Sequence, residues 1–171
     1  MPRYVAFLRG VSPLNASMAE LRGCFEEAGF TEVRTLLSSG NVAFSTRSKP
    51  PAALERKCER AMQARLARSF ITFIRPTAHL QQLIDSDPHG TFALPPGAKR
   101  ILTFLRNDPP PDLALPIARD GAAILQVRGR DVVSAYLPGA DGPAFMRLLE
   151  RSFGPQITTR TLETVQRCAG A

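Results

Sequence analysis

Residues 3–45 constrain the fold more than any other stretch, because three local signals follow one another there in order. Residues 3–9 alternate loosely around Val5, Phe7 and Leu8 without a helix-forming run, and they predict a buried strand that ends at Arg9-Gly10. Residues 17–20, Ser-Met-Ala-Glu, fit a capping box and predict a helix start. Two β-type runs then flank residues 38–41, Ser-Ser-Gly-Asn, which are typical of a hairpin loop. The predicted order is strand, helix, hairpin.

Residues 50–74 extend this order into a known topology. Two prolines at 50–51 predict the start of a second helix, which we expect to run to about Ser69, and residues 70–74 predict a further strand. The resulting β-α-β-β-α-β order is that of a ferredoxin-like split unit. In that unit the first strand ends at the same sheet edge as the loop between strands two and three. We therefore expect Arg9-Gly10 to lie beside residues 38–41.

The second half of the chain repeats part of this pattern. After a short predicted helix at residues 77–85, the Pro- and Gly-rich residues 86–99 predict a linker or covering loop. Further elements are expected as a strand at 100–106, a hairpin at 122–137, a helix between Pro143 and Gly154, and an extended piece with a helix at 157–168. Residues 109–116 contain too many prolines for a good crossover helix.

These patterns predict the α+β class, with two ferredoxin-like (split βαβ) subdomains, antiparallel sheets and an imperfect internal duplication. The expected division is residues 1–85, a βαββαβ subdomain with a short trailing helix, and residues 86–171, a second α+β subdomain with a C-terminal helix. A chain of 171 residues is long enough for two such small units.

The charge of the chain favours an anionic partner, although it is spread rather than clustered. The net charge is +7, which raises the expectation of nucleic acid or another polyanion. Of the 22 basic residues 19 are arginine, a skew that coding bias alone can produce. No apolar run approaches the roughly 20 residues of a membrane span, and residues 1–10 are too short in apolar content for a signal peptide. We expect a basic cytoplasmic protein that does not contact membranes.

Familiar catalytic and metal-binding patterns are missing from the sequence. Cys24, Cys58 and Cys168 are far apart and lack C-x-x-C spacing, so buried reduced thiols are expected. There is no G-x-S-x-G, Walker, G-x-G-x-x-G or H-E-x-x-H motif. His79 and His89 have no evident partner in the pattern. We expect no cofactor and no metal.

A set of polar residues remains as a candidate binding site. Arginine offers a planar fork for phosphate or carboxylate, and hydroxyls beside free backbone N–H groups can hold an anion. The set consists of Arg9, Ser38, Ser39, Asn41, Thr158, Thr159, Arg160, Thr161 and Thr164. A purely structural interpretation is equally open, in which residues 38–41 only turn the chain, the threonines cap a helix and Arg9 faces water.

Three segments of the chain resemble the bacterial family called domain of unknown function 1697. They are RYVAFLRGV, MAELRGCFEEAGFTEVRTLLSSGNVAFS and, more weakly, TTRTLETV. The resemblance implies two small α+β subdomains of ferredoxin-like character, and it implies no reaction. Where many members have N-V-G-G this chain has residues 12–15, Ser-Pro-Leu-Asn, and the Asn and Trp of T-x-R-N-W-x-T are replaced at residues 161–162.

The leading hypothesis is a binding protein for a phosphate-bearing or otherwise anionic ligand, with nucleic acid among the candidates. The expected ligand-binding residues are Arg9, Gly10, Ser39, Gly40, Asn41, Arg160 and Thr161. One alternative is a small-molecule enzyme that uses the same polar cleft, with Glu163 and His89 as its candidate acid or base. Another is an oligomeric interaction module whose sheet edges pair.

Overall fold

The computed structural model describes residues 1–139 and 143–171. The chain divides into two compact units, one formed by Met1–Gln82 with Gln166–Ala171 and the other by Leu83–Val165. The changeovers fall inside two helices, α3 (Thr77–Asp85) and α5 (Leu162–Ala169). The division expected at residue 85 stays a prediction, and the description below follows these two units.

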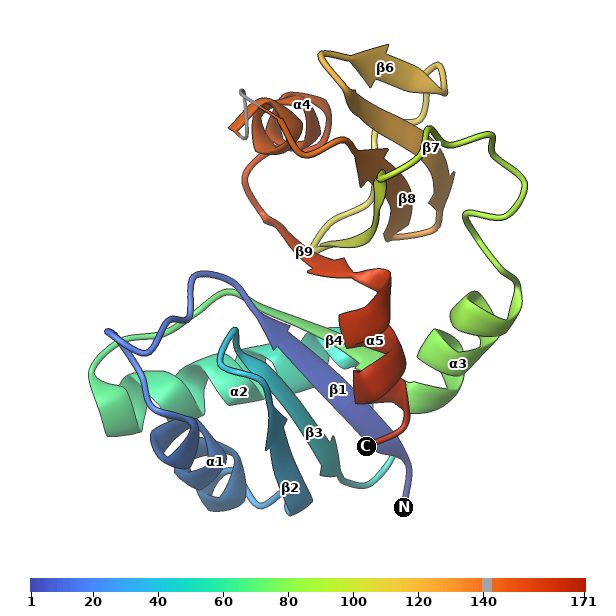
Figure 1. Cartoon of the computed structure of the whole chain (residues 1–171). Helices are drawn as coiled ribbons and strands as arrows, with labels where there is room; N and C mark the ends of the chain where they lie inside the picture. The colour runs from blue at the N-terminus through green and yellow to red at the C-terminus, as the bar shows by residue number, and fades with distance from the viewer. Residues whose placement is uncertain (140–142) are drawn as a thin grey trace. The chain divides into compact units, whose positions relative to one another are not determined.

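The first unit has the predicted β-α-β-β-α-β order (Figure 1). Its elements are β1 (Arg3–Leu8), α1 (Met18–Glu27), β2 (Thr31–Leu36), β3 (Asn41–Ser45), α2 (Pro51–Leu66) and β4 (Thr72–Pro76), followed by α3. The strands form an antiparallel sheet in the order β2-β3-β1-β4. The α+β class predicted from the sequence is confirmed.

Local chemistry fixes the ends of both helices. The Ser17 hydroxyl accepts a hydrogen bond from the Glu20 backbone N–H at 3.1 Å, as the capping box predicts. Pro51 occupies the first turn of α2, where its missing N–H costs nothing. Ala67 adopts a left-handed conformation, with φ of 56°, and ends α2 before the predicted Ser69.

One face of this sheet forms the main core with α1 and α2. Strand residues Tyr4 and Phe44 alternate into it, and the two rings stack with centroids 5.8 Å apart. The helices contribute apolar stripes that include Leu21, Phe25 and Leu54. This arrangement fixes the strand register, because a one-residue slip would turn the apolar side chains to the other face.

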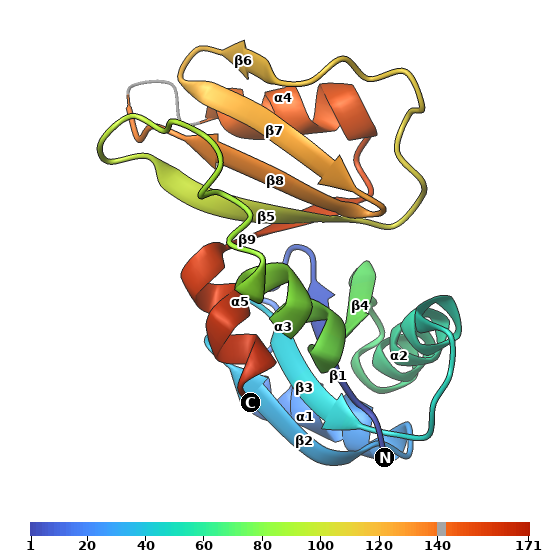
Figure 2. The same cartoon turned by 90° about the vertical axis from the view of Figure 1, so that its right-hand side faces the viewer.

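The opposite face of the same sheet carries several arginines. Ala43 pairs with Arg34 and with Val5, and Val5 pairs with Arg75, which places both arginines on this face. The C-terminal turns of α5 lie on this side, across the sheet from α1 and α2 (Figure 2). Arg3 donates from Nε to the Ala171 carbonyl oxygen at 2.6 Å and thereby ties the chain end to β1.

The outer edge of the sheet at β4 is closed by α2. Glu55 accepts from the Ile74 backbone N–H at 3.0 Å, and Glu59 accepts from that of Thr72 at 3.1 Å. These donors face away from β1, so each would otherwise be available to another strand. Sheet pairing between copies is therefore not favoured at this edge.

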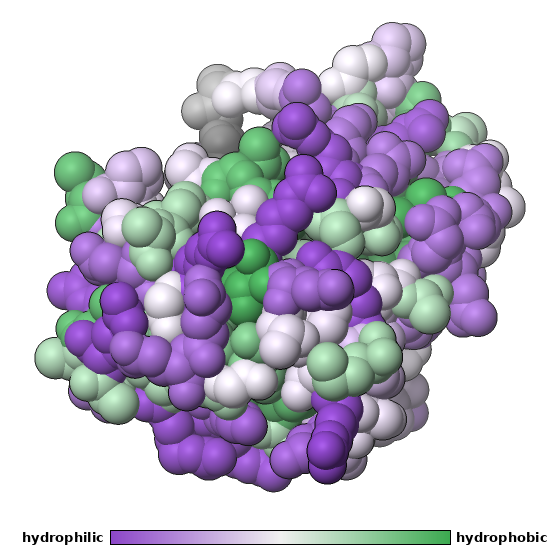
Figure 3. Space-filling view, turned by 90° about the horizontal axis from the view of Figure 1, so that it is seen from below, coloured by the Kyte–Doolittle hydropathy of each residue, from purple (hydrophilic) through white to green (hydrophobic). Residues whose placement is uncertain are grey.

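The face in Figure 3 shows mainly hydrophilic residues with apolar ones in small groups, which is typical of a solvated surface.

The second unit contains a five-stranded antiparallel sheet in the order β6-β7-β8-β5-β9. Its elements are β5 (Lys99–Leu105), β6 (Ile117–Arg119), β7 (Ala122–Arg128), β8 (Asp131–Tyr136), α4 (Pro143–Phe153) and β9 (Ile157–Thr161). Without β6 the order matches that of the first sheet. Helix α4 packs Phe145, Leu148 and Leu149 onto one face.

The two units share their strand order and a helix between the last two strands, α2 and α4, but differ after the first strand. No helix lies between β5 and β6, as the proline content of residues 109–116 predicts. The short strand β6 was not expected from the sequence. Its three residues follow Pro116, and a proline is tolerated beside an edge strand because its missing N–H faces solvent.

His89 anchors the loop before β5 to the second sheet. The side chain is 1% exposed, and its Nε2 lies 3.2 Å from the Ile101 carbonyl oxygen and 3.0 Å from that of Ser134. Since both partners are acceptors, Nε2 carries the proton. Burial lowers the pKa of His89 below its ordinary value of 6.5, and the nearby Arg100 acts in the same direction while Asp87 opposes it.

Acid should therefore weaken the second unit through His89. The unfolded chain binds a proton near pH 6.5 while the folded chain does not, so stability is fully present above pH 6.5 and falls as the pH drops below it. The slope for one group is at most about 1.4 kcal/mol per pH unit. Urea unfolding at several pH values, followed by circular dichroism, measures it. The His89→Gln protein should be less stable at pH 7 and show a smaller loss on acidification; an equal loss would contradict this role.

The three cysteines are buried thiols outside any disulfide, as expected. Burial raises the pKa of the Cys24 thiol and, more strongly, that of Cys58. Within residues 1–139 and 143–171, none of the helices is long and apolar enough to cross a membrane.

Candidate functional site

The structure brings the end of β1 next to the hairpin loop, as the sequence predicts. The Leu8 backbone N–H donates to the Gly40 carbonyl oxygen at 2.8 Å, and Phe7 pairs with Asn41. The Arg9 N–H continues the ladder by donating to the Ile71 carbonyl oxygen at 3.0 Å. The half-buried Arg9 and residues 38–41 thus lie at one edge of the first sheet.

Part of this set is occupied in holding the backbone. Asn41 is fully buried, and its Nδ2 donates to the Leu36 carbonyl oxygen and to the Ser39 hydroxyl, both at 3.0 Å. The Asn15 Nδ2 donates to the Gly10 carbonyl oxygen at 2.8 Å and closes the loop between the two residues. The Asn41 side chain therefore acts as an internal brace of the hairpin, and its contact with a ligand stays a prediction.

The C-terminal members of the predicted set also have local partners. Arg160 donates from a terminal guanidinium nitrogen to the Thr158 hydroxyl at 2.8 Å and to the Thr159 carbonyl oxygen at 2.7 Å. The Thr161 hydroxyl accepts from the Thr164 backbone N–H at 3.2 Å, which makes Thr161 the N-cap of α5. Both residues belong to the second unit, and their contact with a ligand stays a prediction.

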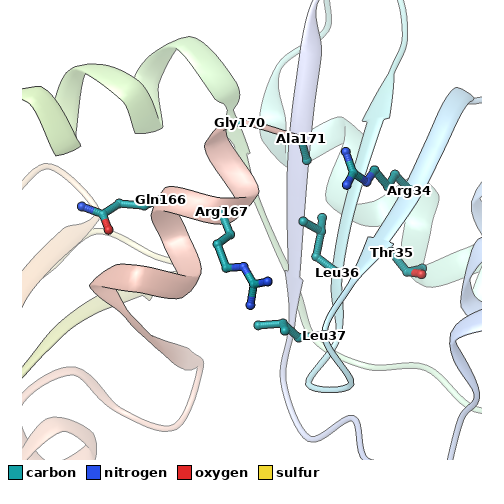
Figure 4. A pocket seen from close by; sticks show the side chains of 8 residues that line it. All are labelled: Arg34, Thr35, Leu36, Leu37, Gln166, Arg167, Gly170 and Ala171. Carbon is teal, nitrogen blue, oxygen red and sulfur yellow. The ribbon is translucent and has the colours of Figure 1, made fainter.

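A cleft on the arginine-bearing face of the first unit is the best candidate site. It has a volume of about 380 Å³ and lies between β2 and the C-terminal turns of α5. We call it the β2–α5 cleft. Its lining residues are Arg34, Thr35, Leu36, Leu37, Gln166, Arg167, Gly170 and Ala171, and Figure 4 shows Arg34 and Arg167 approaching it from the two sides.

The two cleft arginines differ from Arg3 in having no fixed partner. Arg3 is held by Ala171, by the Glu32 carbonyl oxygen at 3.1 Å and by the Ser45 hydroxyl at 3.0 Å. Among the described residues, Arg34 and Arg167 make no side-chain hydrogen bond or ion pair, and both are exposed. Their guanidinium groups are available to a ligand at no cost in broken contacts.

The lining favours anion binding over proton transfer. Two guanidinium forks suit phosphate or carboxylate oxygens, and the Gln166 amide adds further polar atoms. Leu36 and Leu37 supply an apolar wall. No side chain of Asp, Glu, His or Cys lines this cleft, so the lining side chains offer no usual acid or base.

The candidate acids and bases proposed from the sequence lie elsewhere. His89 is buried and engaged in the second sheet, and Glu163 lines a different cavity of that unit together with Thr161, Lys99 and Arg100. In the part of the chain that the structure describes, no cluster of His, Cys, Asp and Glu side chains could hold a metal ion.

Arg34 and Arg167 were not predicted as ligand-binding residues from the sequence, for two different reasons. The strand alternation around Val33 indicates that Arg34 faces away from the main core, and this signal was available. Arg167 becomes relevant only because Gln166–Ala171 belong to the first unit, more than one hundred residues after Arg34 in the chain. No local pattern predicts that contact.

Comparison with known proteins decides the family. A family model described as protein of unknown function (DUF1697) matches residues 1–132. The chain belongs to this family. The match includes all of the first unit's strands and therefore β2 with Arg34, whereas Arg160, Thr161 and Arg167 lie beyond it. The resemblance carried by the first two of the three sequence segments is confirmed, and TTRTLETV lies outside the matched residues.

A solved structure supports the fold of the whole chain. The conserved bacterial protein SP0830 from Streptococcus pneumoniae superimposes with a TM-score of 0.70, at 18% sequence identity, over 99% of this chain and 97% of that chain. At this identity the similarity concerns the fold alone. No curated protein is similar enough in sequence to count as a match.

Proposed function

We propose that this protein binds a small phosphate- or carboxylate-bearing ligand in the β2–α5 cleft. The observation that carries the proposal is the approach of two unpartnered guanidinium groups, Arg34 and Arg167, to one concave surface. A doubly charged oxyanion between them would make charge-assisted hydrogen bonds with both. The proposal keeps the anionic ligand expected from the sequence and moves its main contacts from the hairpin loop to the cleft.

The edge formed by Arg9 and the hairpin is a second part of this proposal. Leu37 lines the cleft, and Ser38–Asn41 follow it directly in the chain. A ligand longer than a single phosphate would reach Ser39, Gly40 and the Arg9-Gly10 segment from there. Mutation of Arg9 would then weaken binding less than mutation of either cleft arginine.

The size of the cleft favours a small ligand over nucleic acid. A volume of about 380 Å³ falls at the lower end of ligand pockets, which span roughly 300–1,000 Å³. Single-stranded nucleic acid is usually held by aromatic side chains that stack with bases, and no aromatic side chain lines this cleft. An oligonucleotide is expected to bind only weakly, through the general positive charge.

Calorimetric titration with inorganic pyrophosphate tests the proposal. Wild-type protein should bind it, and Arg34→Ala and Arg167→Ala should each weaken binding by about tenfold or more, since a hydrogen bond to a charged group contributes about 1.5–3 kcal/mol. Arg56→Ala is the matched control, because Arg56 is an exposed arginine on α2 outside this cleft.

A fluorescent single-stranded oligonucleotide, titrated at two salt concentrations, separates the two kinds of ligand. If the Arg34, Arg167 and Arg56 variants lose equal affinity and binding depends steeply on salt, the protein binds anions by diffuse electrostatic attraction and not at a specific site. If neither pyrophosphate nor the oligonucleotide binds at low salt, the proposal fails and the +7 charge reflects composition.

A further inference from the structure

A second concave region lies in the other unit and has a different character. It is an apolar groove of about 560 Å³, bounded by the loop at residues 92–95, by the β6–β7 hairpin and by Leu137 after β8. Its apolar side chains include Phe92, Leu94, Leu125 and Leu137. Leu137 is 40% exposed, so part of this apolar surface faces solvent.

Strand alternation separates this groove from the core beneath α4. Ile117 and Ile124 pair across β6 and β7 and face the α4 core. Ala118, Ala123 and Leu125 line the groove. Most of the lining side chains are aliphatic and offer no hydrogen-bonding groups, so the groove suits an alkyl chain rather than a sugar or a nucleobase.

Arg119 and Asp120 lie at one end of this groove and also border a smaller concavity. That concavity has a volume of about 220 Å³, and Arg147 and Arg151 of α4 line it together with Arg119. Three of the residues that line this concavity are therefore basic, and one of them, Asp120, is acidic. Arg147 and Arg151 stand four residues apart on one helix, a spacing at which like charges repel. Arg119 and Arg151 make no side-chain hydrogen bond or ion pair with any described residue.

We propose that the second unit binds an unbranched alkyl carboxylate. The alkyl chain lies in the apolar groove, and the carboxylate passes the edge strand β6 to reach Arg119. Arg119 faces α4, because it pairs with Ala122 of the α4 core, and Arg147 and Arg151 add positive charge on that side. The chain supplies hydrophobic burial, while the excess of positive charge at one end selects an anionic head group. This site is independent of the β2–α5 cleft, because the two share no residue.

Titration calorimetry with sodium dodecanoate, below its micelle concentration, tests this inference. Dodecyltrimethylammonium, with the same chain and a cationic head, is the matched ligand control. We expect dodecanoate to bind and the ammonium compound to bind at least about tenfold more weakly. Arg119→Ala should weaken dodecanoate binding by about tenfold, as loss of one charge-assisted contact does.

Two further variants separate the site from nonspecific adsorption. Leu137→Gln changes an exposed side chain, so the fold should persist by circular dichroism while dodecanoate binding weakens several-fold. Arg34→Ala, a change in the other unit, should leave the affinity for dodecanoate unchanged. Equal binding of the two detergents, or dodecanoate binding that survives both Arg119→Ala and Leu137→Gln, would overturn the proposal, as would absence of binding.

Discussion

Gly40→Ala should destabilise the protein by about 3 kcal/mol, because two costs add at this position. Gly40 has φ of 87°, a conformation that L side chains rarely adopt. An added Cβ would also lie 2.9 Å from the Val11 Cβ and 3.1 Å from the Leu8 Cβ. Because the Gly40 carbonyl oxygen accepts the Leu8 N–H, strain here loosens the junction of β1 with the hairpin. Urea unfolding, followed by circular dichroism, measures the loss.

Gly10→Ala is the matched control for this change. Gly10 has a nearly equal φ of 85°, but nothing lies within 4 Å of the position of its Cβ. Gly10→Ala should therefore lower the stability only by the backbone strain, about 1–2 kcal/mol. If the two variants lose the same stability, the close packing of Gly40 against Val11 is not a constraint on the fold.

Glu55→Ala should cost about 3 kcal/mol and open the β4 edge locally. The Glu55 side chain belongs to a residue only 3% exposed, and it accepts the Ile74 backbone N–H at 3.0 Å. Alanine would leave that buried donor without its acceptor. Amide hydrogen exchange gives the local measurement, because exchange at Ile74 should accelerate more than exchange at Phe7 in the central strand β1.

Two variants at the same edge show whether loss of the hydrogen-bond acceptor causes the loss of stability in Glu55→Ala. Glu55→Gln keeps a carbonyl oxygen at the same place and should recover much of the lost stability. Glu59→Ala removes the acceptor for Thr72 from a less buried position, so its cost should be smaller, about 1 kcal/mol. A Glu55→Gln protein as unstable as Glu55→Ala would show that the edge bond contributes little.

The fold of the first unit could be predicted because its signals are local and agree with one another. The capping box at Ser17, the proline start of α2 and the hairpin at residues 38–41 each specify an element independently of tertiary contacts. Strand β6 escaped prediction because three residues give no periodicity. The return of Gln166–Ala171 to the first unit is a long-range contact that no local pattern encodes.

The candidate site was predictable only in part. The sequence correctly placed Arg9 beside the hairpin, since topology alone brings those segments together. The sequence did not indicate whether the Asn41 and Thr161 side chains would bind a ligand or the local backbone. A polar side chain uses the same hydrogen-bonding groups for both, and in the structure both side chains bond to the backbone. Distinguishing these roles requires the partner of each side chain, as with the unpartnered Arg34 and Arg167.

The most direct test of the central claim is an NMR titration that follows the arginine Nε–H signals as pyrophosphate is added. The account predicts that the signals of Arg34 and Arg167 shift together and saturate with one dissociation constant, while those of Arg56 and Arg60 on α2 stay in place. Small shifts spread over all four, without saturation, would contradict a specific anion site in the β2–α5 cleft.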